Sequence, residues 1–159
     1  CDRVRGLPRA APSAFPEIET RALTGERYLL PGDFGAPRAV AAVAFQRRHQ
    51  SDVDGWLPAL LDLERAHDDL RAYEIPCIGR RWAPGRRVID GGMAAAIADR
   101  DARARTLTAY TDVDRVRRAL GLRDTSEIAV VLTRRDGRIA WIGVGPWTAA
   151  AGKALAAAV

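Results

Sequence analysis

Apolar and polar positions alternate along the first third of the chain in the pattern of short β-strands. Glu19–Leu23 and Glu26–Leu30 flank Thr24-Gly25, which is typical of a β-hairpin. The continuous apolar run Ala39–Phe45 has the length of a strand that is covered on both faces. These residues predict a hairpin followed by a strand in the middle of a sheet.

A long amphipathic helix is predicted after the polar residues that follow Phe45. Ser51 is a suitable N-cap, and Pro58 inside the pattern is expected to kink the helix or remove one of its hydrogen bonds. The apolar stripe of this helix consists of Val53, Trp56, Leu57, Leu60 and Leu61. Arg71–Ile78 is the next strand, so strand, helix and strand form a unit with parallel strands and a right-handed crossover.

The segment Gly79–Arg103 has a less regular pattern. Ile89-Asp90-Gly91-Gly92 is expected to interrupt any helix, and Met93–Ile97 is a plausible helix start. We therefore expect a partly helical insert here, without firm boundaries.

The last third of the chain has clear helix and strand signals. Asp112 and Gly121 are the expected start and stop signals of a short helix. Arg135-Asp136-Gly137 is a strong hairpin signal, and Thr148 is a suitable cap for a final helix. The expected elements are the strand Thr106–Tyr110, the helix Val113–Leu120, the strands Ile128–Thr133 and Ile139–Val144, and the helix Thr148–Val159.

Composition adds little to this pattern. The chain has 159 residues, which suits one domain, and a formal net charge of +5. A basic chain favours anionic partners, but acidic residues are interspersed along this one, as on an ordinary mixed surface. Aromatic and basic residues do not interleave in the manner of single-strand binders, so no nucleic-acid partner is expected.

Cys1 is unusual as a first residue. A mature bacterial lipoprotein begins with a lipidated cysteine, and the proline-containing residues 1–16 are typical of a tether. This interpretation predicts a lipid-anchored, membrane-associated protein of the bacterial cell envelope, on its periplasmic or extracytoplasmic face. The alternative is a domain boundary that happens to fall at a cysteine.

The order of the elements and two sequence segments resemble the peroxiredoxin-like branch of the thioredoxin fold. "TLTAYTDVDRVRRALGL" looks like the third parallel strand of that branch and the short helix after it. "IAVVLTRRDGRIAWIGVG" looks like its terminal hairpin, with Asp136-Gly137 at the turn and Gly145 closing the second strand. The resemblance implies a three-layer α/β fold over residues 17–159, with a central mixed sheet, an N-terminal β-hairpin and a helical insert.

The functional motif of that branch is missing here. Counted forward from Phe45 or back from Pro58, the two cysteines of its C-x-x-C motif would fall on Gln50 and Val53. The family's cis-proline would lie near Ile128 and is also absent. Thiol exchange requires a thiolate, which glutamine and valine cannot supply, so the resemblance does not transfer redox activity.

Three strings are similar to cysteine-free relatives of a mitochondrial ATP synthase assembly factor, the ATPase complex subunit ten family. They are "FQRRHQSDVDGWLPAL", "VIDGGM" and "RTLTAYTD". Members of that family are membrane-associated thioredoxin-like proteins that assist assembly of the membrane sector of ATP synthase. The resemblance implies an assembly factor whose partner is a protein, such as a membrane complex, in addition to the membrane surface.

Polar residues follow the predicted carboxyl ends of the parallel strands, where ligands usually bind in open sheets. Arginines beside a helix N-terminus form a natural site for an anion or an acidic peptide. The candidate binding residues are Arg47, His49, Gln50, Asp52, Arg80 and Arg81, with Arg48 beside them. The alternative is a relic of the redox edge that carries only solvated arginines.

Cys77 also lies at this edge and has two interpretations. It is either a reactive thiol or a small buried hydrophobe at a strand end. His49 and His67 have no partner at metal-ligand spacing, and Asp90-Gly91-Gly92 lacks the spacing of a phosphate loop. No metal and no cofactor are therefore expected.

The leading hypothesis from the sequence is a non-catalytic thioredoxin-like binding or assembly module that is tethered to the membrane through Cys1. The alternative hypothesis is a thiol oxidoreductase or peroxidase-like enzyme that uses the lone Cys77. A third possibility is a small-anion or cofactor-binding protein at the same edge.

Overall fold

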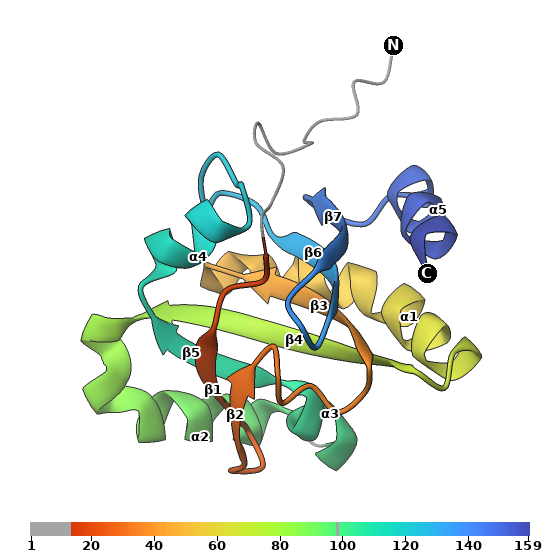
Figure 1. Cartoon of the computed structure of the whole chain (residues 1–159). Coiled ribbons are helices and arrows are strands. Elements are labelled where there is room, and N and C mark those ends of the chain that lie inside the picture. Colours follow the sequence, from red (N-terminus) through yellow and green to blue (C-terminus); the bar gives the residue numbers. More distant parts are fainter. Residues whose placement is uncertain (1–13, 98) are drawn as a thin grey trace.

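A computed structural model describes residues 14–97 and 99–159. The seven strands form one mixed sheet in the order β2-β1-β5-β4-β3-β6-β7 (Figure 1). They are β1 (Ile18–Ala22), β2 (Arg27–Leu30), β3 (Arg38–Ala44), β4 (Leu70–Gly79), β5 (Leu107–Thr111), β6 (Ala129–Arg134) and β7 (Ile139–Val144). The structure confirms the predicted α/β class and the two predicted hairpins, which are antiparallel.

The middle of the sheet is built from the parallel strands β3, β4 and β5. The register between β3 and β4 runs from Arg38 opposite Leu70 to Ala44 opposite Pro76. Strand β4 continues beyond that point, and its last residues pair with β5. The pairing confirms the predicted parallel unit and leaves the ends of β3 and β4 at different heights along the sheet.

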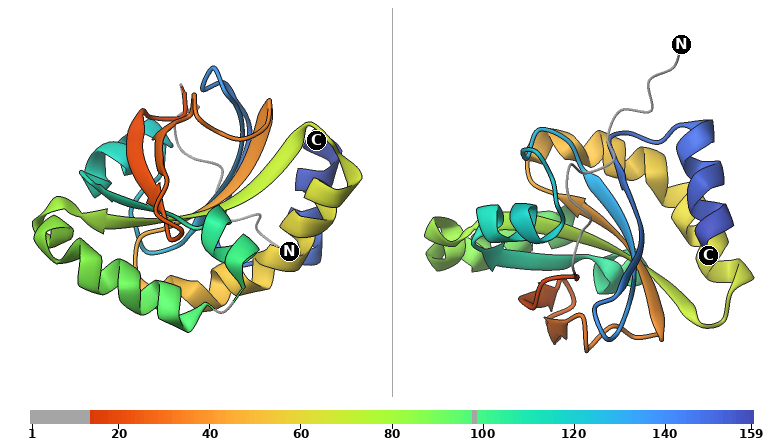
Figure 2. Two further views of the ribbon diagram at one scale, coloured as in Figure 1. Left: turned by 90° about the horizontal axis from the view of Figure 1, so that it is seen from below. Right: turned by 45° about the horizontal axis from the view of Figure 1, so that its top comes forward.

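Among the described residues, five α-helices cover the two faces of the sheet. They are α1 (Gln50–Ala66), α2 (Arg86–Ala96), α3 (Arg100–Arg105), α4 (Val113–Ala119) and α5 (Ala149–Ala158). The helices α1, α2 and α3 lie on one face, and α4 lies on the other (Figure 2). This placement follows from right-handed crossovers, because β3 to β4 and β4 to β5 step in the same direction across the sheet.

Each face of the sheet has its own hydrophobic core. On one face, Val53, Trp56 and Leu60 of α1 and Leu155 of α5 pack on β3 and β6. On the other face, the residues Phe15, Phe34, Val116 and Leu120 cover alternate positions of the same strands. Because helices and loops cover both faces of β3, nearly all of its residues are apolar, as the sequence shows.

The predicted tether ends earlier than expected. Phe15 lies within the expected tether, yet its side chain is buried against Phe34 with 5.6 Å between the ring centroids. Its backbone N–H also donates to the Gly137 carbonyl at 2.8 Å. The packed part of the chain therefore includes Phe15, whereas Cys1 and most of the expected tether lie outside the described residues.

The caps of α4 and α5 agree with the sequence prediction. The Asp112 side chain accepts from the N–H groups of Asp114 and Arg115, and the Thr148 side chain accepts from Ala151. Gly121, which follows the C-cap Leu120 of α4, has a φ of 67°, a conformation that glycine adopts without steric cost.

Two predictions about helix boundaries were wrong. Ser51 is not the N-cap of α1, because a 3-10 turn η1 (Arg47–His49) precedes the helix and His49 takes the cap position. The Gly91-Gly92 pair does not interrupt a helix but lies inside α2, so Met93 is near the end of that helix rather than at its start. Both glycines are exposed, and their cost in helix propensity is about 1 kcal/mol each.

Side-chain contacts connect the insert between β4 and β5 to the rest of the fold. The Tyr110 hydroxyl on β5 donates to the Asp90 carboxylate of α2 at 2.8 Å. The Arg105 guanidinium at the end of α3 forms a two-pronged ion pair with Glu64 of α1. Among the described residues, no helix is both long and apolar enough to span a membrane.

Candidate functional site

The candidate site is the connection between β3 and α1, where the predicted edge of the sheet begins. Strand β3 ends at Ala44, η1 turns the chain, and Gln50 is the first residue of α1. The first N–H groups of a helix have no acceptor within the helix, and the aligned peptide dipoles make this end electropositive. The site is thus a helix N-terminus beside three consecutive basic side chains.

His49 lies at the centre of this connection but is not available to a ligand. Its side chain is 1% exposed. Nδ1 accepts the N–H of Phe45 at 3.1 Å, and Nε2 lies 3.0 Å from the Ser126 carbonyl oxygen. Because Nδ1 accepts a hydrogen bond, the neutral ring with its proton on Nε2 satisfies both partners. The structure makes His49 a positioning residue, which corrects its prediction as a binding residue.

Arg48 and Gln46 extend the same link to the segment before β6. The Arg48 guanidinium donates to the Ser126 carbonyl at 2.7 Å and to the Gln46 side-chain oxygen at 2.7 Å. The Gln46 amide donates to the Thr125 carbonyl at 2.9 Å. Together with His49, these side chains fix the start of α1 against residues 125–126.

The sequence analysis did not identify this partner segment. Its local signal is Asp124, whose side chain accepts the Ser126 N–H at 2.9 Å and so holds a tight turn. Asp-Thr-Ser before an apolar strand could have indicated the turn. It could not have shown that Arg48 and His49 bind the carbonyl groups exposed there.

Gln50 and Val53 occupy the first turn of α1. Gln50 is exposed, and its amide donates to the Asp54 carboxylate at 2.9 Å. Val53 is buried in the core beneath the helix. Asp52 lies between them and is half-buried, with its carboxylate in the first turn, where negative charge is favoured. None of these side chains can carry thiol chemistry.

Cys77 is a core residue. It lies on β4 opposite Ala109 of β5 and is 3% exposed. Burial raises the pKa of the Cys77 thiol to about 12, which leaves little thiolate at neutral pH. Of the two interpretations from the sequence, the structure supports the small buried hydrophobe.

Arg80 and Arg81 lie at the same end of the sheet but belong to a separate cluster. They begin a second 3-10 helix, η2 (Arg80–Gly85), which packs against β4, β5 and α2. The Arg81 guanidinium lies over the Trp82 ring, 5.2 Å from its centroid. In residues 14–97 and 99–159, no hydrogen bond or ion pair joins these arginines to Arg47 or Arg48. The extension of β4 past β3 carries them toward β5 (Figure 1).

Glu74 is a further buried group that the sequence analysis missed. It interrupts the apolar pattern of β4 and is 9% exposed. Burial first, and then the negative charge of Asp54, raise the pKa of the Glu74 carboxyl above its usual range. Because the folded pKa is raised, ionisation of Glu74 above its unfolded pKa opposes folding, so its contribution to stability falls as the pH rises.

Comparison with known proteins gives the fold class. No family model and no curated protein matches the chain. Solved structures do match it. One is the thioredoxin domain of a thiol-disulfide oxidoreductase from Bacteroides vulgatus, with a TM-score of 0.57, 16% identity, and coverage of 93% of this chain and 96% of that one. Another is StoA from Bacillus subtilis, with a TM-score of 0.56, 11% identity, and coverage of 92% and 98%.

A third match is a thioredoxin-like protein from Aeropyrum pernix, with a TM-score of 0.53, 11% identity, and coverage of 89% of this chain and 87% of that one. The chain therefore has the thioredoxin-like fold of thiol:disulfide oxidoreductases. At these identities the likeness shows the fold alone. The start of α1 in this chain holds no cysteine.

Proposed function

We propose that this chain is a non-redox binding and assembly module on a thioredoxin-like scaffold, at the extracytoplasmic face of a bacterial membrane. One observation carries the proposal. The start of α1, where the fold's oxidoreductases hold their thiols, carries Gln50 and Val53, and the Cys77 thiol is buried in the core.

The connection between β3 and α1 (residues 45–50), which we name the α1 entrance, is held in a fixed conformation, and this supports a binding role. Hydrogen bonds from Gln46, Arg48 and His49 fix this connection to residues 125–126. The exposed side chains of Arg47 and Gln50 are therefore presented from a backbone that is already ordered. A partner that binds here pays less conformational entropy than one that must order a loose loop.

The exposed arginines of the two separate clusters at this end of the sheet indicate the chemistry of the partner. Arg47, Arg80 and Arg81 are exposed, and none of them is in an ion pair within the described residues. An acidic segment of a membrane protein would complement them. The resemblance of "FQRRHQSDVDGWLPAL" to assembly factors makes the membrane sector of ATP synthase the first complex to test.

The test is co-purification of this chain with that complex from detergent-solubilised membranes. Arg47→Glu combined with Arg80→Glu is expected to reduce the captured complex by about tenfold, because two charge reversals that face an acidic partner together cost about 1.4 kcal/mol. Arg65→Glu is the matched control, since Arg65 is exposed at the opposite end of α1. Capture that is unchanged in the double variant, or equally reduced in the control, would overturn the site assignment.

A further inference from the structure

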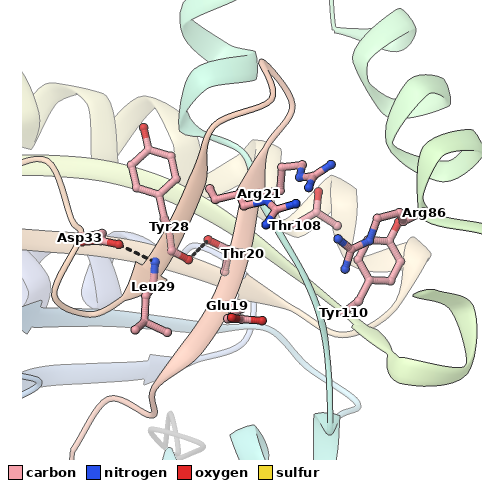
Figure 3. Close-up of a pocket in the computed structure, with 10 residues that line it drawn as sticks. Glu19, Thr20, Arg21, Tyr28, Leu29, Asp33, Arg86, Thr108 and Tyr110 are labelled. Atoms are coloured by element: carbon pink, nitrogen blue, oxygen red, sulfur yellow. Dashed lines mark hydrogen bonds between the residues drawn. The ribbon is translucent and has the colours of Figure 1, made fainter. Parts of the chain in front are cut away.

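A second candidate site lies where strands β1 and β5 separate, next to the parallel strands β3, β4 and β5. These strands pair only through Arg21 opposite Thr108 and Ala22 opposite Leu107. The residues of β1 that precede Arg21 pair with β2, whereas β5 continues after Thr108 along β4 to Thr111. The divergence opens a hollow with a volume of about 280 Å³ between the hairpin, β5 and the start of α2 (Figure 3).

Three arginines line this hollow, which we name the β1–β5 pocket. They are Arg21, Arg27 and Arg86. None of the three forms an ion pair with another described residue. The Arg21 Nε is buried and has no hydrogen-bond partner. Glu19 and Asp33 also line the pocket, so three guanidinium groups lie with two carboxylates and the formal charge of the lining is positive. The Asp33 carboxylate accepts the Leu29 N–H at 2.7 Å.

Thr108 provides an independent indication of a ligand. Its side chain lines the pocket and is 2% exposed, yet its hydroxyl has no hydrogen-bond partner. A buried hydroxyl without a partner opposes folding, so native proteins rarely retain one without a reason. The hydroxyl lies between the side chains of Arg21 and Arg86 in Figure 3.

The walls of the pocket hold Arg86 in place. Its guanidinium lies over the Tyr110 ring, 5.1 Å from the centroid, and the Tyr110 hydroxyl donates to Asp90 of α2 at 2.8 Å. Burial and then this hydrogen bond raise the pKa of Tyr110 above its usual range, so the hydroxyl stays a donor. Tyr28 lines the pocket from the hairpin.

We propose that the β1–β5 pocket binds the phosphate group of a small phosphate monoester. Arg21, Arg27 and Arg86 supply the positive charge, and the Thr108 hydroxyl donates to a phosphate oxygen. A phosphate dianion has three terminal oxygens, which use three guanidinium groups and a hydroxyl better than the two oxygens of a carboxylate can. The volume equals that of roughly nine waters at about 30 Å³ each, which leaves room for an organic group beside Tyr28 and Tyr110.

Thermal unfolding with inorganic phosphate and with phenyl phosphate tests the pocket. Both ligands are expected to stabilise the chain in a saturable way, phenyl phosphate at lower concentration, because binding to the native state raises its stability. Sodium chloride at equal ionic strength is the control for screening. Absence of a saturable effect beyond that of chloride would overturn the proposal.

Variants assign the effect to residues. Arg21→Gln and Arg86→Gln are each expected to weaken phosphate binding by about tenfold or more, whereas Arg87→Gln, an exposed neighbour on α2, is expected to leave it unchanged. Equal binding in all three variants would contradict the assignment. The pocket shares no residue with the α1 entrance, so this result does not depend on the proposed assembly role.

Thr108→Val gives the sharpest test and does not depend on the arginine variants folding. Valine has nearly the shape of threonine but removes the unpartnered hydroxyl. Without ligand, this variant is expected to unfold at a temperature equal to or above that of the parent chain, and with phosphate it is expected to gain less stability. A Thr108→Val chain that gains as much from phosphate as the parent would exclude a role for the hydroxyl in binding.

Discussion

A chain that combines Gln50→Cys with Val53→Cys is expected to gain a reversible disulfide and a reactive thiol at the start of α1. Gln50 is exposed at the first residue of this helix, and Val53 lies one turn further along with 2% exposure. Side chains three residues apart on a helix have Cβ atoms about 5–6 Å apart, which a small adjustment brings into disulfide range. Cysteine also replaces buried valine as a small hydrophobe.

The reactivity of the new thiol at position 50 follows from the helix. The helix dipole favours the thiolate there, and Arg47 and Arg48 add positive charge. Alkylation at pH 7 is expected to be about threefold to tenfold faster than for Arg65→Cys, which places a thiol at the opposite, electronegative end of α1. Both chains should carry Cys1→Ser so that only the introduced thiols react.

Two outcomes would contradict this account. Equal alkylation rates at positions 50 and 65 would show that the helix does not begin at Gln50. Failure of the double variant to form a disulfide under oxidising conditions would show that positions 50 and 53 do not have the geometry of a C-x-x-C motif.

His49→Leu is expected to lower the free energy of unfolding by about 2–3 kcal/mol, although His49 touches no ligand. Leucine leaves the Phe45 N–H buried without an acceptor and removes one of the two donors to the Ser126 carbonyl. In a chain of this size, the midpoint of thermal unfolding would fall by about 4–12 °C.

One further variant tests the hydrogen bonds of His49, and another serves as a control. His49→Asn places an oxygen near the position of Nδ1, so it is expected to restore part of the loss by accepting from Phe45. Arg47→Gln changes an exposed neighbour and should stay within about 0.5 kcal/mol of the parent. Equal stability of the His49→Leu chain and the parent chain would show that this residue does not hold the α1 entrance in place.

The fold could be predicted from the sequence where local helix and strand signals agree with the burial of side chains in the structure. The run Ala39–Phe45 is apolar because β3 is covered on both faces, and Asp112 is a good N-cap that the structure uses as one. The start of α1 was misplaced because the 3-10 turn at Arg47–His49 moves the helix start ahead of Ser51. The path of α2 through Gly91-Gly92 was missed because a contact from a distant strand, between Tyr110 and Asp90, helps to hold that helix.

The candidate site stays a prediction, but the structure shows where its residues lie. Gln50 and Val53, which the resemblance placed at the expected cysteine positions, both lie in the first turn of α1. The sequence could not show that His49 is buried or that β4 carries Arg80 and Arg81 away toward β5. The burial of His49 depends on Ser126, which lies 77 residues further along the chain. The position of Arg80 and Arg81 depends on how far β4 extends past β3. The β1–β5 pocket depends in the same way on how two distant strands diverge.

Reduction of insulin disulfides with dithiothreitol as reductant tests most directly the proposed lack of thiol–disulfide exchange activity in this thioredoxin-like chain. Because the pKa of buried Cys77 is raised to about 12 and residues 50 and 53 carry no thiol, we expect the unmodified chain and its Cys77→Ser variant to match the blank without protein. Turnover by the unmodified chain that disappears in Cys77→Ser would contradict the account and identify the chain as an oxidoreductase.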